Sequence, residues 1–375
     1  MSKNVKQIKF NGCSSPTIGV EIELFTVDSD SLALTNAAPK ILNHFKDNIF
    51  FKEELLQCIV EITSDVCGNV EEIYNDLRPK INQAIDYANK NNFDLLAMPI
   101  HPFSRVSDQS VTENDRYISF LDRMQWPLRR LLISGIHVHV GVESGEMAIA
   151  IVNGMKRYIP LLIALSANSP YFEGEATGLA STRTKIFEGL PNTGIPVNLT
   201  NYSEFQKFMR TLIGANSIDS IREIWWDIRP HPGYGTVEIR ICDTIPNLHH
   251  IQDLTALIQA LVVGLANHYN NGTQLPYLDS WVIYENKWRA TRYGLDADLI
   301  IDSEGNQESI SDIIINTIKA LEPEAEELNL VKYLENIVER VKKNNSYFKK
   351  QILLYDKHND FKEVIRESIY TLKNS

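Results

Sequence analysis

Three segments of the chain carry two ionisable residues two positions apart within otherwise apolar sequence. The pairs, in chain order, are Glu21 with Glu23, His137 with His139, and Glu238 with Arg240. Side chains two apart on a strand share a face, so each segment predicts a strand with one apolar and one ionisable face. A solvated face would explain any single pair. Three pairs made of carboxylate, imidazole and guanidinium groups instead favour a metal or phosphate site.

Two more acids belong to this pattern. Glu61 lies in the apolar run IVEIT, and Glu54 precedes it by seven residues. Glu61 alone could be a buried acid paired with an arginine. Several acids on one face would repel each other unless a cation lay among them. Oxygen-rich ligation favours Mg²⁺ or Mn²⁺, while the two histidines keep Zn²⁺ open.

Arginines in segments that contain proline or glycine form a second group. Its members are Arg183, Arg229, Arg289 and Arg292. A planar guanidinium can hold carboxylate or phosphate with two hydrogen bonds, although a surface arginine usually only adds solubility. Metal ions together with arginines are what phosphoryl transfer needs, because its transition state is stabilised mainly by position and charge.

Several common nucleotide and nucleophile motifs are absent from the sequence. It has no G-x-x-x-x-G-K-[ST], no G-x-G-x-x-G after a strand and no G-x-S-x-G. A P-loop, a Rossmann site and covalent hydrolase chemistry therefore lack support. Nucleotide phosphates, if bound, must be held through metal ions and arginines.

Composition narrows the class of protein. The 375 residues are 43% hydrophobic with a formal net charge of -11, which indicates a globular chain and makes nucleic-acid binding unfavourable. Four cysteines without a C-x-x-C pair favour a reduced, cytoplasmic setting. The greasiest stretch, 254–266, falls short of the ~20 apolar residues of a membrane span, so no membrane anchor is expected.

Short apolar runs, which predict strands, alternate along the chain with longer helical patterns. These elements would position the ionisable residues. We expect strands at residues 18–27, 59–63, 95–98, 136–142 and 236–242, and helices at 70–90, 146–165, 203–213 and 251–269. Residues 168–199 predict a binding loop or lid. Beyond Asp302 the sequence becomes charged and helical without a clear strand. The expected organisation is a catalytic domain over 1–300 and a helical appendage over 301–375 packed on it.

Eight motifs carry a family resemblance. TIGVEIEL, IVEITSDVC, IHPF, ENDRY, GIHVHVGV, LIALSANSPY, WDIRPHPGYGTVEIRICDT and WRATRYGL follow in this order. Together they resemble the carboxylate-amine ligase branch of the type 2 glutamate-cysteine ligases, which has a glutamine-synthetase-like catalytic fold. The resemblance runs from about Ile18 to Leu295. It implies an α+β fold with a curved, mostly antiparallel sheet that forms a funnel, helices on its convex face, and ATP and the acid substrate entering from opposite ends.

The same resemblance implies roles for individual residues. Mg²⁺, or Mn²⁺ in its place, would be held by Glu21, Glu23, Glu54, Glu61, His137 and Glu238. Glu54 matches the family pattern least well, because it precedes the clear motif. Arg229 and Arg240 would face the transferred phosphate. His139 and Arg292 would contact the nucleotide, and Arg183 the substrate carboxylate.

The expected function is an ATP-dependent ligation that forms an amide through an acyl phosphate. The resemblance implies the γ-carboxylate of L-glutamate as the acid, L-cysteine or a related amine as the second substrate, and a homodimer. Three alternatives stay open: a phosphagen-kinase-like phosphotransferase, a metal-dependent amidohydrolase suggested by H-x-H, and a ligand-binding protein that kept the fold.

Overall fold

A seven-stranded sheet forms the centre of the computed structural model, which describes residues 7–375; residues 1–6 of the expected catalytic domain lie outside them. The strand order is β10-β11-β5-β1-β3-β2, with β4 also paired to β1, and each of these pairings is antiparallel. The strands are β1 (Ile18–Asp28), β2 (Phe51–Glu53), β3 (Ile59–Thr63), β4 (Phe93–Leu96), β5 (Gly135–Gly141), β10 (Ile228–His231) and β11 (Thr236–Asp243).

The short apolar runs of the sequence predict five of these strands closely. β3 has the predicted bounds, and β1, β4, β5 and β11 begin and end within two residues of them. The two missed strands are short: β2 has three residues, and β10 has four including Pro230. Runs this short show no periodicity, and a proline argues against a strand.

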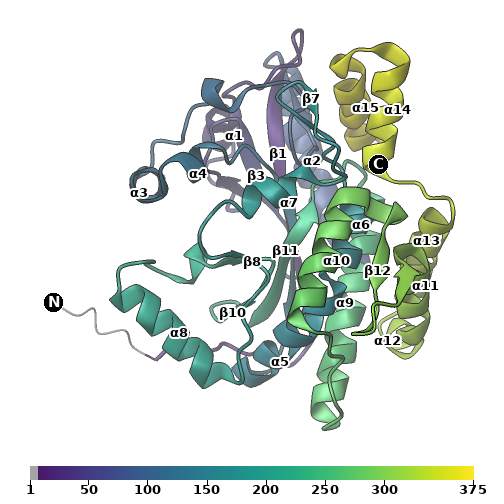
Figure 1. Ribbon diagram of the computed structural model, residues 1–375. Coiled ribbons are helices and arrows are strands. Elements are labelled where there is room, and N and C mark those ends of the chain that lie inside the picture. Colours follow the sequence, from purple (N-terminus) through teal and green to yellow (C-terminus); the bar gives the residue numbers. More distant parts are fainter. Residues whose placement is uncertain (1–6) are drawn as a thin grey trace.

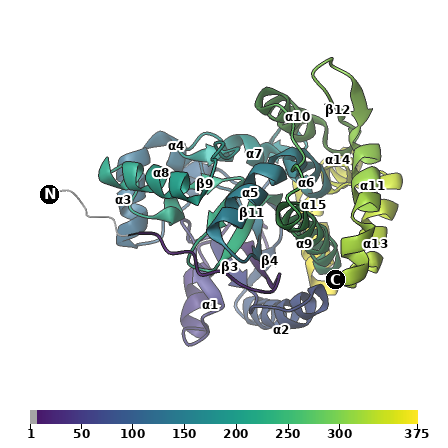
Figure 2. The same ribbon diagram turned by 90° about the horizontal axis from the view of Figure 1, so that it is seen from below.

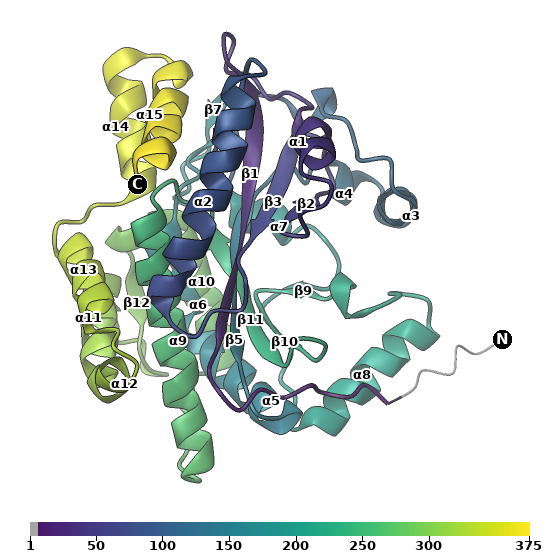
Figure 3. The ribbon, with the colours of Figure 1, turned by 180° about the vertical axis from the view of Figure 1, so that it is seen from behind.

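The apolar face of the sheet packs under four helices, as the view from behind shows (Figure 3). They are α2 (Val70–Asn89), α5 (Gly145–Met155), α6 (Ile159–Ser166) and α9 (Leu248–Asn270). Ile22 and Val138 of the predicted apolar face are at most 1% exposed. The predicted helix at 146–165 is interrupted by a 3-10 turn and restarts as α6, with Pro160 in its first turn. Proline suits a helix start because it lacks the N–H that would go unpaired there.

Two helical stretches are long and apolar enough to span a membrane by length and composition. They are Gly145–Ser166 and Leu248–Asn270. In each, 78% of the most apolar 18-residue stretch is buried inside the structure. Both contribute to the main hydrophobic core. Core helices pass the same test of length and composition, so the two stretches are weak evidence for a membrane segment.

Other helices stand over the ionisable face of the sheet (Figure 1). They are α3 (Asp115–Met124), α4 (Trp126–Arg129) and α7 (Thr182–Phe187), with α8 (Tyr202–Gly214) and β9 (Trp225–Trp226) alongside and α1 (Ala38–His44) next to β2. The predicted loop at 168–199 is therefore partly regular. Besides α7 it contains β6 (Tyr171–Phe172), β7 (Glu175–Ala176) and β8 (Thr193–Gly194).

The C-terminal part is helical, as expected, with one exception. It comprises α10 (Ser280–Tyr293), α11 (Ile310–Ala320), α12 (Glu322–Glu327), α13 (Val331–Lys342), α14 (Tyr347–His358) and α15 (Phe361–Asn374). The expectation of no strand beyond Asp302 was wrong, because β12 (Asp298–Ile300) pairs with β13 (Gln307–Ser309). β13 is a polar three-residue strand without a detectable pattern.

These helices pack on the rest of the chain. The view from below shows α11 and α13 outside α9 (Figure 2). On α15, the Ser368 hydroxyl donates to the backbone carbonyl of Ala97, after β4, at 3.0 Å. The division into 1–300 and 301–375 stays a prediction, and its boundary falls at the end of β12, within the β12–β13 hairpin.

Candidate active site

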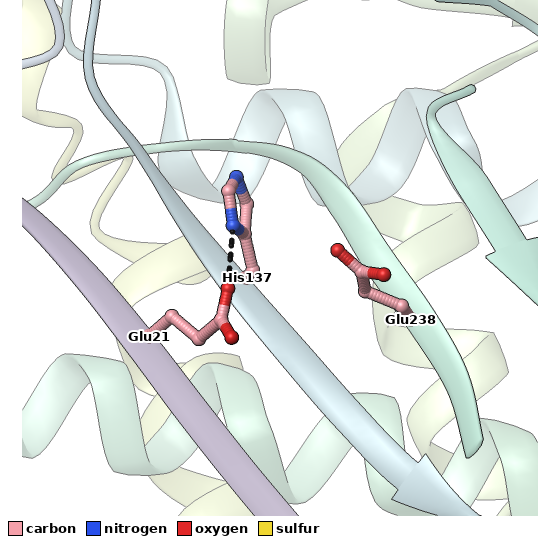
Figure 4. Close-up of side chains that lie close together, drawn as sticks. All are labelled: Glu21, His137 and Glu238. Atoms are coloured by element: carbon pink, nitrogen blue, oxygen red, sulfur yellow. Dashed lines mark hydrogen bonds and ion pairs between the residues drawn. The ribbon is translucent and has the colours of Figure 1, made fainter. Parts of the chain in front are cut away.

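The ionisable pairs meet on one face of neighbouring strands. Glu21 of β1 lies opposite His137 of β5, and His139 lies opposite Glu238 of β11. On the other side of β1, Glu23 lies opposite Glu61 of β3. Figure 4 shows Glu21 bonded to His137, with the carboxylate of Glu238 directed toward them. Residues far apart in the sequence are thus joined by strand register.

The distances within this group suit cation binding. His137 Nδ1 is 3.0 Å from Glu21 Oε2, and its Nε2 is 3.8 Å from Glu23 Oε1. His139 Nε2 is 3.6 Å from Glu21 Oε1 and 4.0 Å from Glu238 Oε1. Two sets of donor atoms lie within 4.8 Å of one another: Glu21, His137 and Glu238 in one, and Glu23, Glu61 and His137 in the other.

The donor set fits a divalent cation that prefers oxygen. The buried Nε2 of His139 has no hydrogen-bond partner among the described residues, although two carboxylates face it. Lys52 of β2 places its ammonium 3.1 Å from Glu61 and 3.7 Å from Glu21, which supplies positive charge at one side. Carboxylates with a few imidazole nitrogens suit Mg²⁺ or Mn²⁺.

The acids differ in how easily they ionise. Burial and the neighbouring Glu23 raise the pKa of Glu54 to about 8. Burial and then Glu21 raise the pKa of Glu61 well above its usual range. Burial also opposes ionisation of Glu21, but the hydrogen bond with His137 and the nearby imidazole of His139 outweigh it and hold the pKa of Glu21 well below the usual range. A bound cation would favour the ionised form of every acid in this carboxylate cluster (Glu21, Glu23, Glu54, Glu61 and Glu238).

Arg229 and Arg240 both bind Glu238 but differ in what they leave free. Arg229 donates to Glu238 at 2.6 Å through Nε and 3.1 Å through Nη2, and its Nη1 donates to two backbone carbonyls. Arg240 donates to Glu238 through Nη1, while its buried Nε has no partner among the described residues. Burial disfavours the charge of Glu238, but the two arginines outweigh it and hold its pKa well below the usual range. The predicted phosphate contact suits Arg240 better, because all three guanidinium nitrogens of Arg229 already donate to Glu238 or to backbone carbonyls.

A β-bulge aims Arg240. The pairing of β11 with β5 shifts between Ile239 and Cys242, so Arg240 and Ile241 together lie opposite His137. Arg183 of α7 donates to the backbone carbonyls of both bulge residues, each at 3.1 Å. A Cβ on Gly135 would lie 2.8 Å from Arg183 Cζ and closer still to its Nη2. Glycine at 135 is therefore what lets the guanidinium lie across β5.

Two cavities meet at the carboxylate cluster. The small cavity, of about 100 Å³, is lined by Glu23, Glu54, His137, Arg183 and Arg240 and by apolar side chains that include Tyr117, Phe120 and Trp225. The large cavity, of about 540 Å³, is lined by Glu21, Lys52, His139, Thr236, Tyr234 and others. The two residues of a pair thus line different cavities. Glu23 and His137 line the small cavity, whereas their pair partners Glu21 and His139 line the large one.

Arg292 is not part of this assembly. It lies in the last turn of α10, lines neither cavity, and has its guanidinium 4.9 Å from the ring of its neighbour Tyr293. Its nucleotide contact stays a prediction. Arg289, in the same motif, donates to Glu285 and to the backbone of Asp298, so it fixes the β12–β13 hairpin.

Sequence reasoning missed three residues of the site and its surroundings. Lys52 lies on β2, which is too short to show a pattern, and Tyr117 stands in the motif ENDRY without a distinguishing neighbour. Lys287 lies in the segment ENKWRATRYGL, where the arginines are the more conspicuous cations, yet it is the one with a buried charged group. Burial separates Tyr117 and Lys287 from ordinary surface polar groups, whereas Lys52 is distinguished by its ion pairs with Glu21 and Glu61.

Comparisons with known proteins identify the family of the chain. The family model described as "Glutamate-cysteine ligase family 2" matches residues 17–374, which extends the likeness through the C-terminal helices. A Frankia alni protein named "Putative glutamate–cysteine ligase 2-1" is 39% identical over 365 residues, covering 96% of each chain. A Mycobacterium tuberculosis protein named "Putative glutamate–cysteine ligase 2" is 37% identical over 364 residues, covering 97% of this chain and 96% of that one.

Solved structures share the fold at low identity. A glutamate–cysteine ligase from Francisella tularensis in complex with AMP aligns with a TM-score of 0.73 and 13% identity, over 98% of this chain and 90% of that one. A bifunctional glutathione synthetase from Pasteurella multocida aligns with a TM-score of 0.72 and 10% identity, over 96% of this chain and 52% of that one. At these identities the likeness shows a common fold.

Proposed function

Since the chain belongs to glutamate-cysteine ligase family 2 and is an ATP-dependent carboxylate-amine ligase, we propose that its acid substrate is L-glutamate. The γ-carboxylate would be activated by ATP and joined to the amine of L-cysteine or a related amine. The observation that carries this proposal is the carboxylate cluster between two cavities, because it lets a bound cation face a nucleotide on one side and an acid on the other.

The large cavity is the proposed nucleotide site. Three apolar or aromatic side chains at its rim are unusually exposed for their type: Ile49 at 78%, Val66 at 80% and Tyr234 at 59%. Such a rim suits a purine, which brings its own apolar and aromatic surface. Lys52 and His139 line the same cavity and would lie toward the phosphates.

The small cavity is the proposed acid site. Its volume of about 100 Å³ suits a small substrate, and it holds two guanidinium groups, those of Arg183 and Arg240. The Nε atoms of both arginines are buried without hydrogen-bond partners among the described residues. Unsatisfied buried donors are costly, so a carboxylate or phosphoryl oxygen would bind them favourably.

The proposed reaction has two steps. The γ-carboxylate oxygen of the acid attacks the γ-phosphorus of ATP, ADP leaves, and an acyl phosphate forms. The amine then attacks the carbonyl carbon, inorganic phosphate leaves and the amide bond forms. Phosphorylation is needed because a carboxylate repels nucleophiles and lacks a good leaving group.

The chain's own residues would position and neutralise charge in this reaction. Mg²⁺, held by the carboxylate cluster and His137, would offset charge on the phosphates when bound. Arg240, aimed by the bulge, would offset charge on the transferred group, and losing one such donor typically costs about 3 to 4 kcal/mol. Arg229 would keep Glu238 in place as a ligand.

Family membership favours a ligase over the alternative functions that the sequence left open. A phosphagen-kinase-like enzyme would stop after phosphoryl transfer, and an amidohydrolase would not need ATP. The homodimer and the cytoplasmic location stay predictions.

A screen for ATP consumption tests the proposal. Purified protein is supplied with Mg²⁺, ATP, L-glutamate and one amine at a time, cysteine included, and ADP and product mass are measured together. We expect ADP in proportion to amide, and a hydroxamate when hydroxylamine replaces the amine. ADP formed without an acid, or no ADP with any pair, would contradict the proposal.

A further inference from the structure

A buried lysine outside both cavities connects α10 to the strands of the active site. The side chain of Lys287 is 3% exposed, and its ammonium lies 2.6 Å from Asp227 Oδ2 and 2.7 Å from Glu188 Oε1. Burial disfavours its charge, but the two carboxylates outweigh burial and raise its pKa. Lys287 is therefore charged at neutral pH and holds two acids from different segments.

The first of these acids supports the bulge. Asp227 lies between β9 and β10, and its backbone carbonyl accepts a hydrogen bond of 2.8 Å from the backbone N–H of Arg240. Its own N–H donates to the carbonyl of Gly194 in β8 at 2.8 Å. This bond continues the β10–β11 pairing one position beyond Ile228 and Ile239, so Asp227 holds the first bulge residue from the β10 side.

The second acid belongs to the helix that carries Arg183. Glu188 directly follows α7, and Arg183 of this helix donates to the backbone carbonyls of Arg240 and Ile241. The bulge is thus bonded from two sides, by Asp227 at its N–H and by Arg183 at its carbonyls. Lys287 is bonded directly to Asp227 and, through Glu188, to the end of the helix that carries Arg183.

We propose that Lys287 is a positioning residue for the acid substrate: by pairing with Asp227 and Glu188 it fixes the bulge that aims Arg240 and the helix that carries Arg183. This inference rests on the proposed function, in which both arginines face the acid. Lys287 lines neither the small nor the large cavity, so it acts through the arginines. Misplacing a reacting group by about 1 Å can lower the rate about a hundredfold, so loss of Lys287 weakens turnover without removing a substrate contact.

The test compares Lys287→Met with Lys185→Met. Lys185 also pairs with Glu188, but its side chain is 44% exposed and no ion pair joins it to Asp227. For Lys287→Met we expect kcat/KM for L-glutamate to fall about fiftyfold or more, with the Kd of a non-hydrolysable ATP analogue within about twofold of wild type. For Lys185→Met we expect both values within about twofold. Equal losses in the two variants, or an equal loss of nucleotide binding in Lys287→Met, would overturn the proposal.

A double variant separates positioning from stability. In Lys287→Met the buried carboxylate of Asp227 is left without its partner, which destabilises the fold. Adding Asp227→Asn removes that charge and keeps the backbone carbonyl, so we expect the melting temperature to recover while kcat/KM for glutamate stays low. Recovery of both together would mean that Lys287 only stabilises the fold.

A readout that needs no activity keeps this inference separate from the proposed function. Hydrogen–deuterium exchange followed by mass spectrometry reports the Arg240 amide within peptides covering β11. We expect at least tenfold faster exchange there in Lys287→Met and wild-type exchange in Lys185→Met. If the wild-type protein consumes no ATP with any acid and amine, the proposed function fails, and unchanged exchange in Lys287→Met would independently refute the link to the bulge.

Discussion

The two cavities that meet at the carboxylate cluster are lined by different kinds of structure. The small cavity lies between sheet and helices, and its arginines are fixed by hydrogen bonds to the bulge and by the buried ion pair of Arg240 with Glu238. The large cavity is bounded by strand residues and by side chains that stand largely exposed, such as Ile49 and Val66. The contrast matches two demands: phosphoryl transfer to an acid needs fixed geometry, whereas a purine needs mainly apolar surface.

Glu21 belongs to both sides of this comparison, so its loss has the largest expected effect. It contacts His137, which lines the small cavity, and His139, which lines the large one. We expect Glu21→Gln to lower turnover about a hundredfold or more, because the cation and the phosphates it neutralises lose a ligand charge. Steady-state kinetics with ATP and the acid check this. Near-normal turnover with an intact circular dichroism spectrum would remove Glu21 from the site.

Gly135→Ala is expected to disturb the small cavity and leave the large one intact. The new methyl group would collide with the guanidinium of Arg183, which must then leave the bulge carbonyls. We expect the KM for L-glutamate to rise about tenfold, equivalent to about 1.4 kcal/mol, while the KM for ATP stays within about twofold. Gly214→Ala is the matched control, because a Cβ there meets nothing within 4 Å. A similar rise in both KM values would argue against separate cavities.

Tyr234→Ala tests the large cavity in the same way. The Tyr234 ring lines the large cavity and stacks on His231, with 4.2 Å between ring centroids. Loss of an aromatic contact worth about 1 kcal/mol should weaken ATP binding about fivefold, with little change in the KM for glutamate. Calorimetry with an ATP analogue measures this, and Tyr277→Ala, at a tyrosine that is 69% exposed and lines neither cavity, serves as control. A change confined to glutamate would reverse the assignment of the cavities.

His101, outside both cavities, has the smallest expected effect on activity and affects stability instead. Burial lowers the pKa of His101 to about 4, whereas an unfolded histidine titrates near 6.5. The unfolded chain therefore binds the proton first as pH falls, so the stability contribution is complete above about pH 6.5 and is lost toward pH 4. We expect the wild type to lose about 1 to 2 kcal/mol more than His101→Gln between pH 7.5 and 5 in urea unfolding. Equal losses would show that His101 titrates normally.

Strand periodicity made the centre of the site predictable. The pairs on β1, β5 and β11 share one face whatever the loops do, so the sequence pattern alone indicated that Glu21, His137 and Glu238 could meet. Strand register then placed Glu23 beside Glu61.

Features set by tertiary packing could not be predicted in this way. The bulge in β11 changes which groups Arg240 faces, and no residue type in TVEIRICD signals it. Arg229 shares a motif with Arg240, yet its Nη1 donates to the backbone carbonyls of Ile221 and Ile224, which lie outside every predicted strand. Lys287 gains its importance only from burial between two acids.

The central claim is that ATP activates the γ-carboxylate of the acid at the junction of the two cavities. Its most direct test uses L-glutamate labelled with ¹⁸O in the γ-carboxylate, together with ATP, Mg²⁺ and the amine that gives most product. Attack on the γ-phosphorus predicts that the released phosphate contains one ¹⁸O atom for each amide formed. Phosphate free of ¹⁸O alongside normal amide formation would contradict the account.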